Sequence, residues 1–521
     1  MKDYLQIKDV NEMTIDELVG QTIMCGLPYD YLDNESKEFI KKYNIGNFIL
    51  FARNYKDTNG MKKFMKDLYE FSLDNVSSFP LVSIDQEGGM VTRLFKDVTF
   101  PASPLTTSLS SFKDACLITG RIIGEDMMKL GLNLNLAPCL EINHELKSHL
   151  VNVRSYGYNK EMVIKGARSF IDGLHESNCL SCLKHFPGAG KSTKDSHLEL
   201  PIIEDKKEDI MNEEMYPFLK LMDNDSIMSS HCLFKSFDDV PTTLSRKFLT
   251  DFLRGEVGFK GLVISDGMEM KAIYDHYGIE KGCIMALNAG CDILLVCHEK
   301  ELQEKAINAV RNAVKNGEID LEELKDKVRR INEAKKRTSV GLKKYLNFDK
   351  PYEIKEEDHR IMEDIVFSSF TLFYGKAPIY TKDALIYTPK AIVGSIVEDE
   401  FNSRDLTKAL RKNFDNEIIE FNEETDFVNK QIEYINKNNV KDVIAYSYDA
   451  FKMNNQINLI NELANQNINL YVVSLKGPMD RLLFKNIKNY SCLYEYTPNS
   501  IKCIIEQLKR NIKTNNFDFK I

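Results

Sequence analysis

Apolar runs in the first part of the chain end in side chains that can move protons or attack a carbon atom. Asp85, His231 and Asp266 each follow such a run, and Lys184 and His185 together follow another. A carboxylate or an imidazole held beside a reacting group can act as general acid, general base or nucleophile. One such residue can equally cap a helix, whereas several at successive run ends predict a shared site.

A second pair of residues with chemical potential lies in the polar segment 188–201. Asp195 and His197 are two residues apart there, so the carboxylate could accept a hydrogen bond from the imidazole, fix its tautomer and favour its charged form. A histidine held in this way could donate a proton and later take one back. Taken alone, the pair is explained better by a turn that the aspartate side chain stabilises.

Two further motifs suggest cofactors but do not support them. The segment 188–193 reads Gly-Ala-Gly-Lys-Ser-Thr, yet a phosphate-binding loop requires glycine at the position of His185, and Pro187 would interrupt the loop. Cys179 and Cys182 form a lone C-x-x-C pair, and residues three apart in a strand face opposite sides. The sequence therefore predicts no nucleotide, no metal and no other cofactor.

The apolar runs and the amphipathic stretches between them must position these residues. Continuous apolar runs that alternate with helical stretches are typical of parallel strands buried on both faces. Eight such units predict an α/β protein with a (β/α)₈ barrel, in which functional residues gather at the carboxyl ends of the strands. An open, doubly wound sheet is the alternative, but it rarely has eight consecutive units. The runs are 21–26, 46–51, 80–84, 132–137, 179–183, 226–230, 261–265 and 291–296, and the helical stretches are 60–73, 112–130, 161–174, 209–222, 246–254 and 279–288.

The rest of the chain predicts a second, smaller unit. A charged helical stretch at 302–336 completes the barrel domain, which we assign to 1–340, and a polar linker follows at 341–364. Residues 365–521 then form an α/β sandwich domain, because strand-like runs again alternate with helical stretches. Its predicted strands are 384–388, 391–396, 417–421, 442–447, 469–474 and 491–496.

Composition narrows the classes of partner. The 521 residues carry a formal net charge of −9 and the pI is about 5.7, which argues against nucleic acid or an anionic membrane as partner. No signal peptide is expected, and no apolar run approaches the ~20 residues that span a bilayer. The 11 cysteines show no framework spacing, so we expect a reducing compartment and a cytoplasmic protein.

Several long segments of the chain resemble family 3 glycoside hydrolases of the β-N-acetylglucosaminidase branch, in their two-domain form. The segments occur in family order and span nearly the whole predicted barrel, whereas the second domain resembles the family's α/β sandwich only loosely. The resemblance implies a retaining enzyme that removes terminal β-linked N-acetylglucosamine through a covalent intermediate. The segments are GNFILFARN (46–54), IDQEGGMVTRL (84–94), NLAPCLEIN (135–143), NVRSYG (152–157), KHFPGAGKSTKDSHLELP (184–201), PTTLS (241–245) and VISDGMEMKAI (263–273).

The resemblance also implies a role for each matching residue. Asp266 corresponds to the nucleophile, His197 to the general acid/base and Asp195 to its partner, and no cofactor or metal is needed. The implied substrate is an oligosaccharide or muropeptide that contains N-acetylglucosamine. The residues implied to hold its terminal sugar in the −1 subsite are Asp85, Arg93, Arg154, Lys184 and His185.

Three features depart from the family pattern, and two other functions compete with hydrolysis. Ala189 stands where the family often has histidine, Val153 replaces the usual glycine before Arg154, and the chain has no tryptophan, so sugar stacking would use tyrosine or phenylalanine. A phosphorylase is one alternative, because a neutral histidine repels phosphate less than a carboxylate does. The other is a sugar-binding barrel without catalysis, although every expected catalytic residue type is present.

Overall fold

Eight parallel strands close into a barrel, and each of them lies within one predicted apolar run or overlaps it. The structure is a computed structural model that describes residues 4–143, 151–188, 196, 198–390, 405–510 and 515–516. Its strands are buried nearly throughout, which is why they read as continuous apolar runs. The (β/α)₈ prediction is confirmed. The barrel strands are β1 (Ile23–Gly26), β2 (Asn47–Leu50), β3 (Leu81–Ile84), β6 (Leu134–Asn135), β7 (Leu180–Phe186), β9 (Ser226–Ser229), β11 (Leu262–Gly267) and β12 (Ile293–Val296).

Helices connect the strands and cover the outside of the barrel. Polar side chains fix where several of them begin: the side chain of Asp57 accepts a hydrogen bond from the Gly60 amide, and that of Asn159 from the Met162 amide. The main covering helices are α1 (Ile15–Gln21), α2 (Asn34–Tyr43), α3 (Thr58–Asn75), α5 (Ala115–Leu130), α6 (Lys160–His175), α9 (Lys271–Tyr277), α10 (Ile279–Ala289), α11 (Lys300–Lys315) and α12 (Leu321–Tyr345).

Two helical stretches that the sequence predicts as continuous are interrupted. The stretch 209–222 forms α7 (Lys207–Asn212) and α8 (Tyr216–Lys220), because proline has no amide proton and Pro217 fits only in the first turn of a new helix. The stretch 302–336 divides into α11 and α12 at Gly317, whose φ of 75° ends the first helix. The stretch 246–254 is a π-helix, η5 (Lys247–Glu256).

A buried lysine closes the end of the barrel where the strands begin. The Nζ atom of Lys335 donates to the Gln21 side chain at 3.0 Å, to the Gly46 carbonyl at 2.8 Å and to the Ser78 hydroxyl at 2.6 Å. These three residues lie shortly before β1, β2 and β3, respectively, and the lysine comes from α12. With this end filled, the opposite, carboxyl end is the one open to chemistry.

The second unit is built on a seven-stranded sheet in the order β15-β14-β16-β17-β18-β13-β19. Four predicted strands coincide with its parallel strands, the run 491–496 contributes only its first residues, and the run 391–396 lies outside the described residues. The sequence analysis missed β13 and β19. The strands are β13 (Thr371–Tyr374), β14 (Leu385–Thr388), β15 (Ile418–Glu420), β16 (Asp442–Ser447), β17 (Asn469–Ser474), β18 (Tyr490–Cys492) and β19 (Asn515–Asn516).

Helices cover both faces of this sheet, so the predicted sandwich is confirmed. Alternate residues of β16 point to opposite sides: Val443 and Ala445 pack with α15 (Phe427–Lys437) and α16 (Asn454–Ala464), whereas Ile444 and Tyr446 belong to the other core. That other core is formed with α13 (Glu356–Ser369), α14 (Leu406–Asn413) and α17 (Pro498–Arg510).

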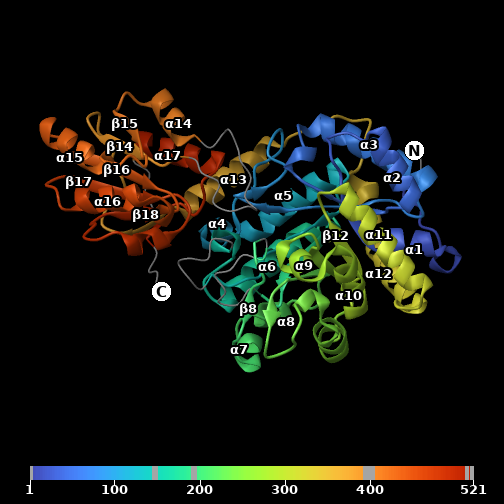
Figure 1. Cartoon of the computed structure of the whole chain (residues 1–521). Helices are drawn as coiled ribbons and strands as arrows, with labels where there is room; N and C mark the ends of the chain where they lie inside the picture. The colour runs from blue at the N-terminus through green and yellow to red at the C-terminus, as the bar shows by residue number, and fades with distance from the viewer. Residues whose placement is uncertain are drawn as a thin grey trace.

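The two units meet at this second core, which includes barrel-side residues. Met90, Leu105 and Val153 are buried in the same cluster as the second unit's apolar side chains. In Figure 1, α13 and α4 (Pro104–Leu109) lie at the junction of the two units. The predicted boundaries, with a linker at 341–364, stay a prediction; α12 extends into that range as far as Tyr345. None of the described helices is both long and apolar enough to cross a membrane.

Candidate active site

A cavity of about 430 Å³ opens at the carboxyl end of the barrel and gathers six of the eight predicted site residues. Asp195 and His197 lie outside the described residues. Ser196, between them, is described: its carbonyl oxygen accepts a hydrogen bond from the Ala272 amide at 3.3 Å, directly after the cavity-lining Lys271. The six lining residues are Asp85, Arg93, Arg154, Lys184, His185 and Asp266.

Glu87, which the sequence analysis did not assign, joins these residues into one ion-paired group. Its carboxylate accepts two hydrogen bonds from the Arg154 guanidinium, both at 2.8 Å, and lies 2.6 Å from the Lys184 ammonium. Lys184 also donates to Asp85 at 2.6 Å, and Arg93 lies 4.0 Å from the other Asp85 oxygen. The side chains of Glu87 and Lys184 are 1% and 2% exposed, so this group exchanges little with water.

Burial and charge act in opposite directions on this group. Burial alone would raise the pKa of Glu87, but the charges of Arg154 and Lys184 hold that pKa far below its ordinary value. Burial likewise disfavours the charged form of Lys184, and Asp85 and Glu87 raise its pKa above the ordinary value despite it. Glu87, Arg154 and Lys184 are therefore ionised at neutral pH, and two cations share one buried carboxylate.

Hydrogen bonds between side chains and the backbone hold the Asp85–Glu87 segment at the strand end. The side chain of Asn135, the last residue of β6, accepts from the Gln86 amide at 3.1 Å and donates to the Gln86 carbonyl at 2.9 Å. The Gln86 side chain in turn accepts from the amides of Arg93 and Leu94 at 2.9 and 3.0 Å. Gln86 thereby connects three separate pieces of chain, and its two neighbours are directed into the cavity.

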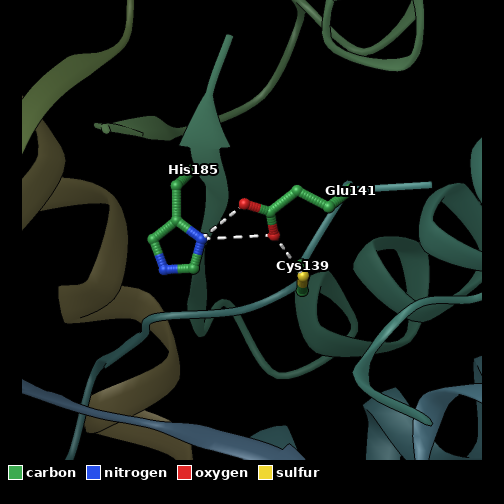
Figure 2. A group of neighbouring side chains, drawn as sticks. All are labelled: Cys139, Glu141 and His185. Carbon is green, nitrogen blue, oxygen red and sulfur yellow. Dashed lines mark hydrogen bonds and ion pairs between the residues drawn. The ribbon is translucent and has the colours of Figure 1, made fainter. Parts of the chain in front are cut away.

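His185 is oriented from behind by a carboxylate that the sequence analysis also missed (Figure 2). Its Nδ1 atom lies 3.0 Å from one oxygen of Glu141, and the thiol of Cys139 donates to the other oxygen at 2.7 Å. Burial would raise the pKa of Glu141, but His185 lowers it below the ordinary value. The contact fixes the imidazole plane and leaves its other nitrogen, Nε2, on the side away from the carboxylate.

The same three side chains have the spacing of metal ligands, since their donor atoms lie within 4.8 Å of one another. A metal would require the Cys139 thiolate. Burial and the charge of Glu141 raise the pKa of Cys139 well above its ordinary value, and the thiol donates a hydrogen bond to Glu141. The three side chains form a hydrogen-bonded chain that ends on His185.

Asp266 lies at the end of β11, where the pairing with β12 shifts register between Ile264 and Gly267. Its Oδ1 atom accepts from the Gly267 amide at 2.8 Å, which fixes the carboxylate. A matching irregularity in the β7–β9 pairing spans Lys184 and His185, which are both directed into the cavity. Such bulges re-aim side chains where a regular strand would alternate them.

His231 is buried behind this strand end and does not line the cavity. Its Nε2 atom lies 2.9 Å from the Gly267 carbonyl, and its Nδ1 atom lies 2.9 Å from the Thr243 hydroxyl. His231 therefore supports Gly267, the residue after Asp266.

The cavity rim carries polar residues that the sequence analysis did not single out. Glu269 accepts from the amides of Cys297 and His298 at 2.6 and 3.1 Å, and burial raises its pKa in spite of these donors. Lys271 and His298 also line the cavity. Glu269 and Lys271 follow Asp266 in the segment 263–273, so their position after a strand end was the available signal, as it was for Glu87.

Comparison with known proteins identifies relatives of both units. The model of the glycosyl hydrolase family 3 N-terminal domain matches residues 14–334. A β-hexosaminidase from Tolumonas auensis is 31% identical over 287 residues, which are 54% of this chain and 84% of that protein. One from Haemophilus influenzae is 30% identical over 292 residues, which are 54% of this chain and 80% of that protein. The solved structure of a glycoside hydrolase family 3 β-N-acetylglucosaminidase from Paenibacillus sp. str. FPU-7 is 29% identical with a TM-score of 0.87, and the match covers 96% of this chain and 98% of that one.

Replacing Glu87 with glutamine tests the ion-paired group. We expect Glu87→Gln to lower the free energy of unfolding by about 3–5 kcal/mol, because it leaves two buried cations without their shared carboxylate. The folded-state pKa of Glu87 lies below that of the unfolded chain, so its contribution is complete above pH ~4.3 and is lost as the pH falls toward the folded-state value. Urea unfolding between pH 3 and 7 measures both effects.

The control is Glu322→Gln, which removes an exposed carboxylate paired with Lys325 on one helix. Its effect should stay below ~0.5 kcal/mol at every pH. Equal stabilities of the two variants at neutral pH would contradict a stabilising role for Glu87.

Proposed function

The chain belongs to glycosyl hydrolase family 3 and is a glycoside hydrolase, and we propose that it removes terminal β-linked N-acetylglucosamine with retention of configuration. One observation carries the proposal: Asp266 and the ion-paired group around Glu87 line the same cavity at the carboxyl end of the barrel. The names of the relatives, β-hexosaminidase and β-N-acetylglucosaminidase, support the choice of sugar.

The cavity is proposed as the −1 subsite for this sugar. Its volume of about 430 Å³ is in the range of sites for small ligands. Asp85 and Lys184 offer an acceptor and donors to the sugar hydroxyls, and Arg93, Arg154 and His185 complete the binding set. Phe51 and Met270 offer apolar surface for the ring and the acetamide methyl group. Because the polar side chains are already ion-paired, they are oriented before the sugar arrives.

Asp266 is the proposed nucleophile. Its carboxylate attacks the anomeric carbon, the bond to the leaving oxygen breaks, and a covalent glycosyl-enzyme forms. Water then attacks the same carbon and releases the sugar with its original configuration. The Gly267 amide and the support of His231 behind it favour one fixed carboxylate position.

His197 is the proposed acid/base, oriented by Asp195. It donates a proton to the leaving oxygen and then accepts one from the attacking water. Support comes from the family resemblance and from Ser196, the residue between them, whose carbonyl oxygen accepts a hydrogen bond from Ala272 in the helix that follows Asp266.

We propose cell-wall muropeptides as the source of the substrate and the cytoplasm as the setting. Cleavage would leave N-acetylmuramic acid or a peptide-bearing sugar as the second product. The 11 cysteines support a reducing compartment, because all of them are free and buried.

The nucleophile is tested by substitution and by labelling. Asp266→Ala should lower kcat/KM by ~10³-fold or more while the fold persists, because the covalent step is lost. A 2-fluoro or 5-fluoro N-acetylglucosaminide analogue should label Asp266, as read by mass spectrometry of peptides. Asp275→Ala removes an exposed carboxylate on the following helix and should leave kcat/KM unchanged. Label on another residue would overturn the assignment.

Substrate and acceptor are tested together by product analysis. An aryl N-acetyl-β-glucosaminide should be cleaved up to ~10⁴-fold faster than an aryl β-glucoside, because a site that hydrogen-bonds the acetamide leaves polar groups unpaired without it. With a muropeptide disaccharide, the product should be free N-acetylglucosamine whether or not phosphate is present. Equal rates on the two aryl glycosides would contradict the sugar assignment, and a sugar 1-phosphate would identify a phosphorylase.

The acid/base pair is tested by comparing leaving groups. His197→Ala should slow sugar leaving groups by ~10²–10⁴-fold but spare the first step for an aryl group that leaves without a proton. The covalent intermediate should then accumulate and give a burst, and azide should restore turnover because it needs no deprotonation. Asp195→Ala should give a milder version. Nearly wild-type kinetics in both variants would show that the segment is only a turn.

A further inference from the structure

The second domain reaches the barrel through a buried carboxylate, Glu495, which follows β18. One of its oxygens accepts the Ser103 amide at 2.8 Å, and the other accepts the Thr497 hydroxyl at 2.6 Å. The Ser103 hydroxyl also donates to the Tyr494 carbonyl at 3.2 Å. Glu495 and Ser103 are both fully buried, so the bonds form away from water, where an unmatched carboxylate is costly.

Ser103 belongs to a segment that lies directly on the turn after Glu87. Gly88 and Gly89 have φ values of 103° and 59°, and the Gly89 amide donates to the Pro101 carbonyl at 2.9 Å. A Cβ atom on Gly88 would lie 2.2 Å from the Ala102 carbonyl oxygen, and one on Gly89 would lie 2.4 Å from the Ser103 Cβ. The turn therefore cannot move independently of residues 101–103.

The second domain also contacts the short helix that carries Arg154, the partner of Glu87. Arg154 ends the short helix η3 (Asn152–Arg154). Gly477, shortly after β17, approaches that helix so closely that a Cβ atom on it would lie 2.9 Å from the Asn152 side-chain oxygen. Val153 is buried in the apolar cluster that contains Tyr494. The second domain thus packs against the supports of both members of the Glu87–Arg154 pair.

We propose that Glu495 is a positioning residue for the −1 subsite: by holding Ser103 against the turn at Gly88 and Gly89, it sets where Glu87 receives Arg154 and Lys184. This inference rests on the proposed function, because it concerns the sugar site. Each described residue that lines the cavity comes from the barrel, so the second domain acts on the site through these contacts. A displacement of ~1 Å in such a group is enough to cost ~10²-fold in rate.

The test measures KM, kcat and thermal unfolding of the full chain with an aryl N-acetyl-β-glucosaminide. Glu495→Ala should raise KM and lower kcat/KM by ~10–100-fold. Glu495→Gln keeps an acceptor for the Ser103 amide and should recover kcat/KM to within ~3-fold of the parent. Thr497→Val removes the hydroxyl that orients Glu495 and that also accepts the Ser500 amide at 3.3 Å at the start of α17. It should give a smaller rise in KM together with a lower unfolding temperature, and it serves if the alanine variant does not fold.

The matched control is Leu463→Ala, in the core on the other face of the second domain's sheet. It should lower the unfolding temperature without changing KM, because that core contains second-domain residues only. A KM in the Glu495 and Thr497 variants equal to that of this control would overturn the positioning role. Wild-type chain that does not cleave the glycoside would instead refute the proposed function.

A double-variant cycle shows whether the effect passes through Glu87. Glu495→Ala should change the dissociation constant of N-acetylglucosamine much less in a Glu87→Gln background than in the parent, because the group that it positions is already disrupted. If the dissociation constant of the double variant changed by the product of the two single-variant fold-changes, the two residues would act independently and the proposal would be overturned.

Discussion

The carboxylate of Glu87 is the contact on which the organisation of the cavity depends. It stands between Arg154 and Lys184, which come from a short helix before α6 and from the end of β7. Two buried cations that share one carboxylate would repel each other without it, and each of them alone would be more stable in water. With the shared carboxylate present, three distant pieces of chain are fixed relative to one another, and Asp85 is drawn into the same group.

Residues around the Glu87 group restrict the movement of the side chains that line the cavity. Asn135 pairs with both backbone groups of Gln86, and Glu141 orients His185 through its Nδ1 atom. His231 contacts the carbonyl beside Asp266. None of these bonds is strong by itself, since a net hydrogen bond contributes only ~1 kcal/mol. Their common effect is that the side chains lining the cavity are held from behind, which lowers the entropic cost of binding.

The sequence predicted those parts of the molecule that follow from local pattern. The barrel strands were predictable because burial on both faces makes each a continuous apolar run, and Asp85, Lys184, His185 and Asp266 were predictable because they end such runs. The prediction of one helix over 209–222 was wrong, because the hydrophobic period continues through a stretch in which Pro217 starts a new helix. Glu87 follows a strand end, which is a local signal, but its role depends on Arg154, 67 residues away, and that of Glu141 depends on His185, 44 residues away. No local pattern encodes such partners.

The division of labour between the two units follows from the geometry of a barrel. The barrel fixes its strand ends through backbone pairing, but Glu87 lies beyond β3, in a short extension with one two-residue partner strand, β5 (Val91–Thr92). Such an extension has few bonds of its own and needs an external surface to hold it. The surface present is the core shared with the second domain, which buries Met90 at the tip of the extension and Val153 beside Arg154. Apolar burial holds the two units together but is not directional. The hydrogen bond that Glu495 accepts from the Ser103 amide then fixes the position of residues 101–103 relative to the second domain. A domain whose described residues do not line the cavity can in this way determine the shape of the site.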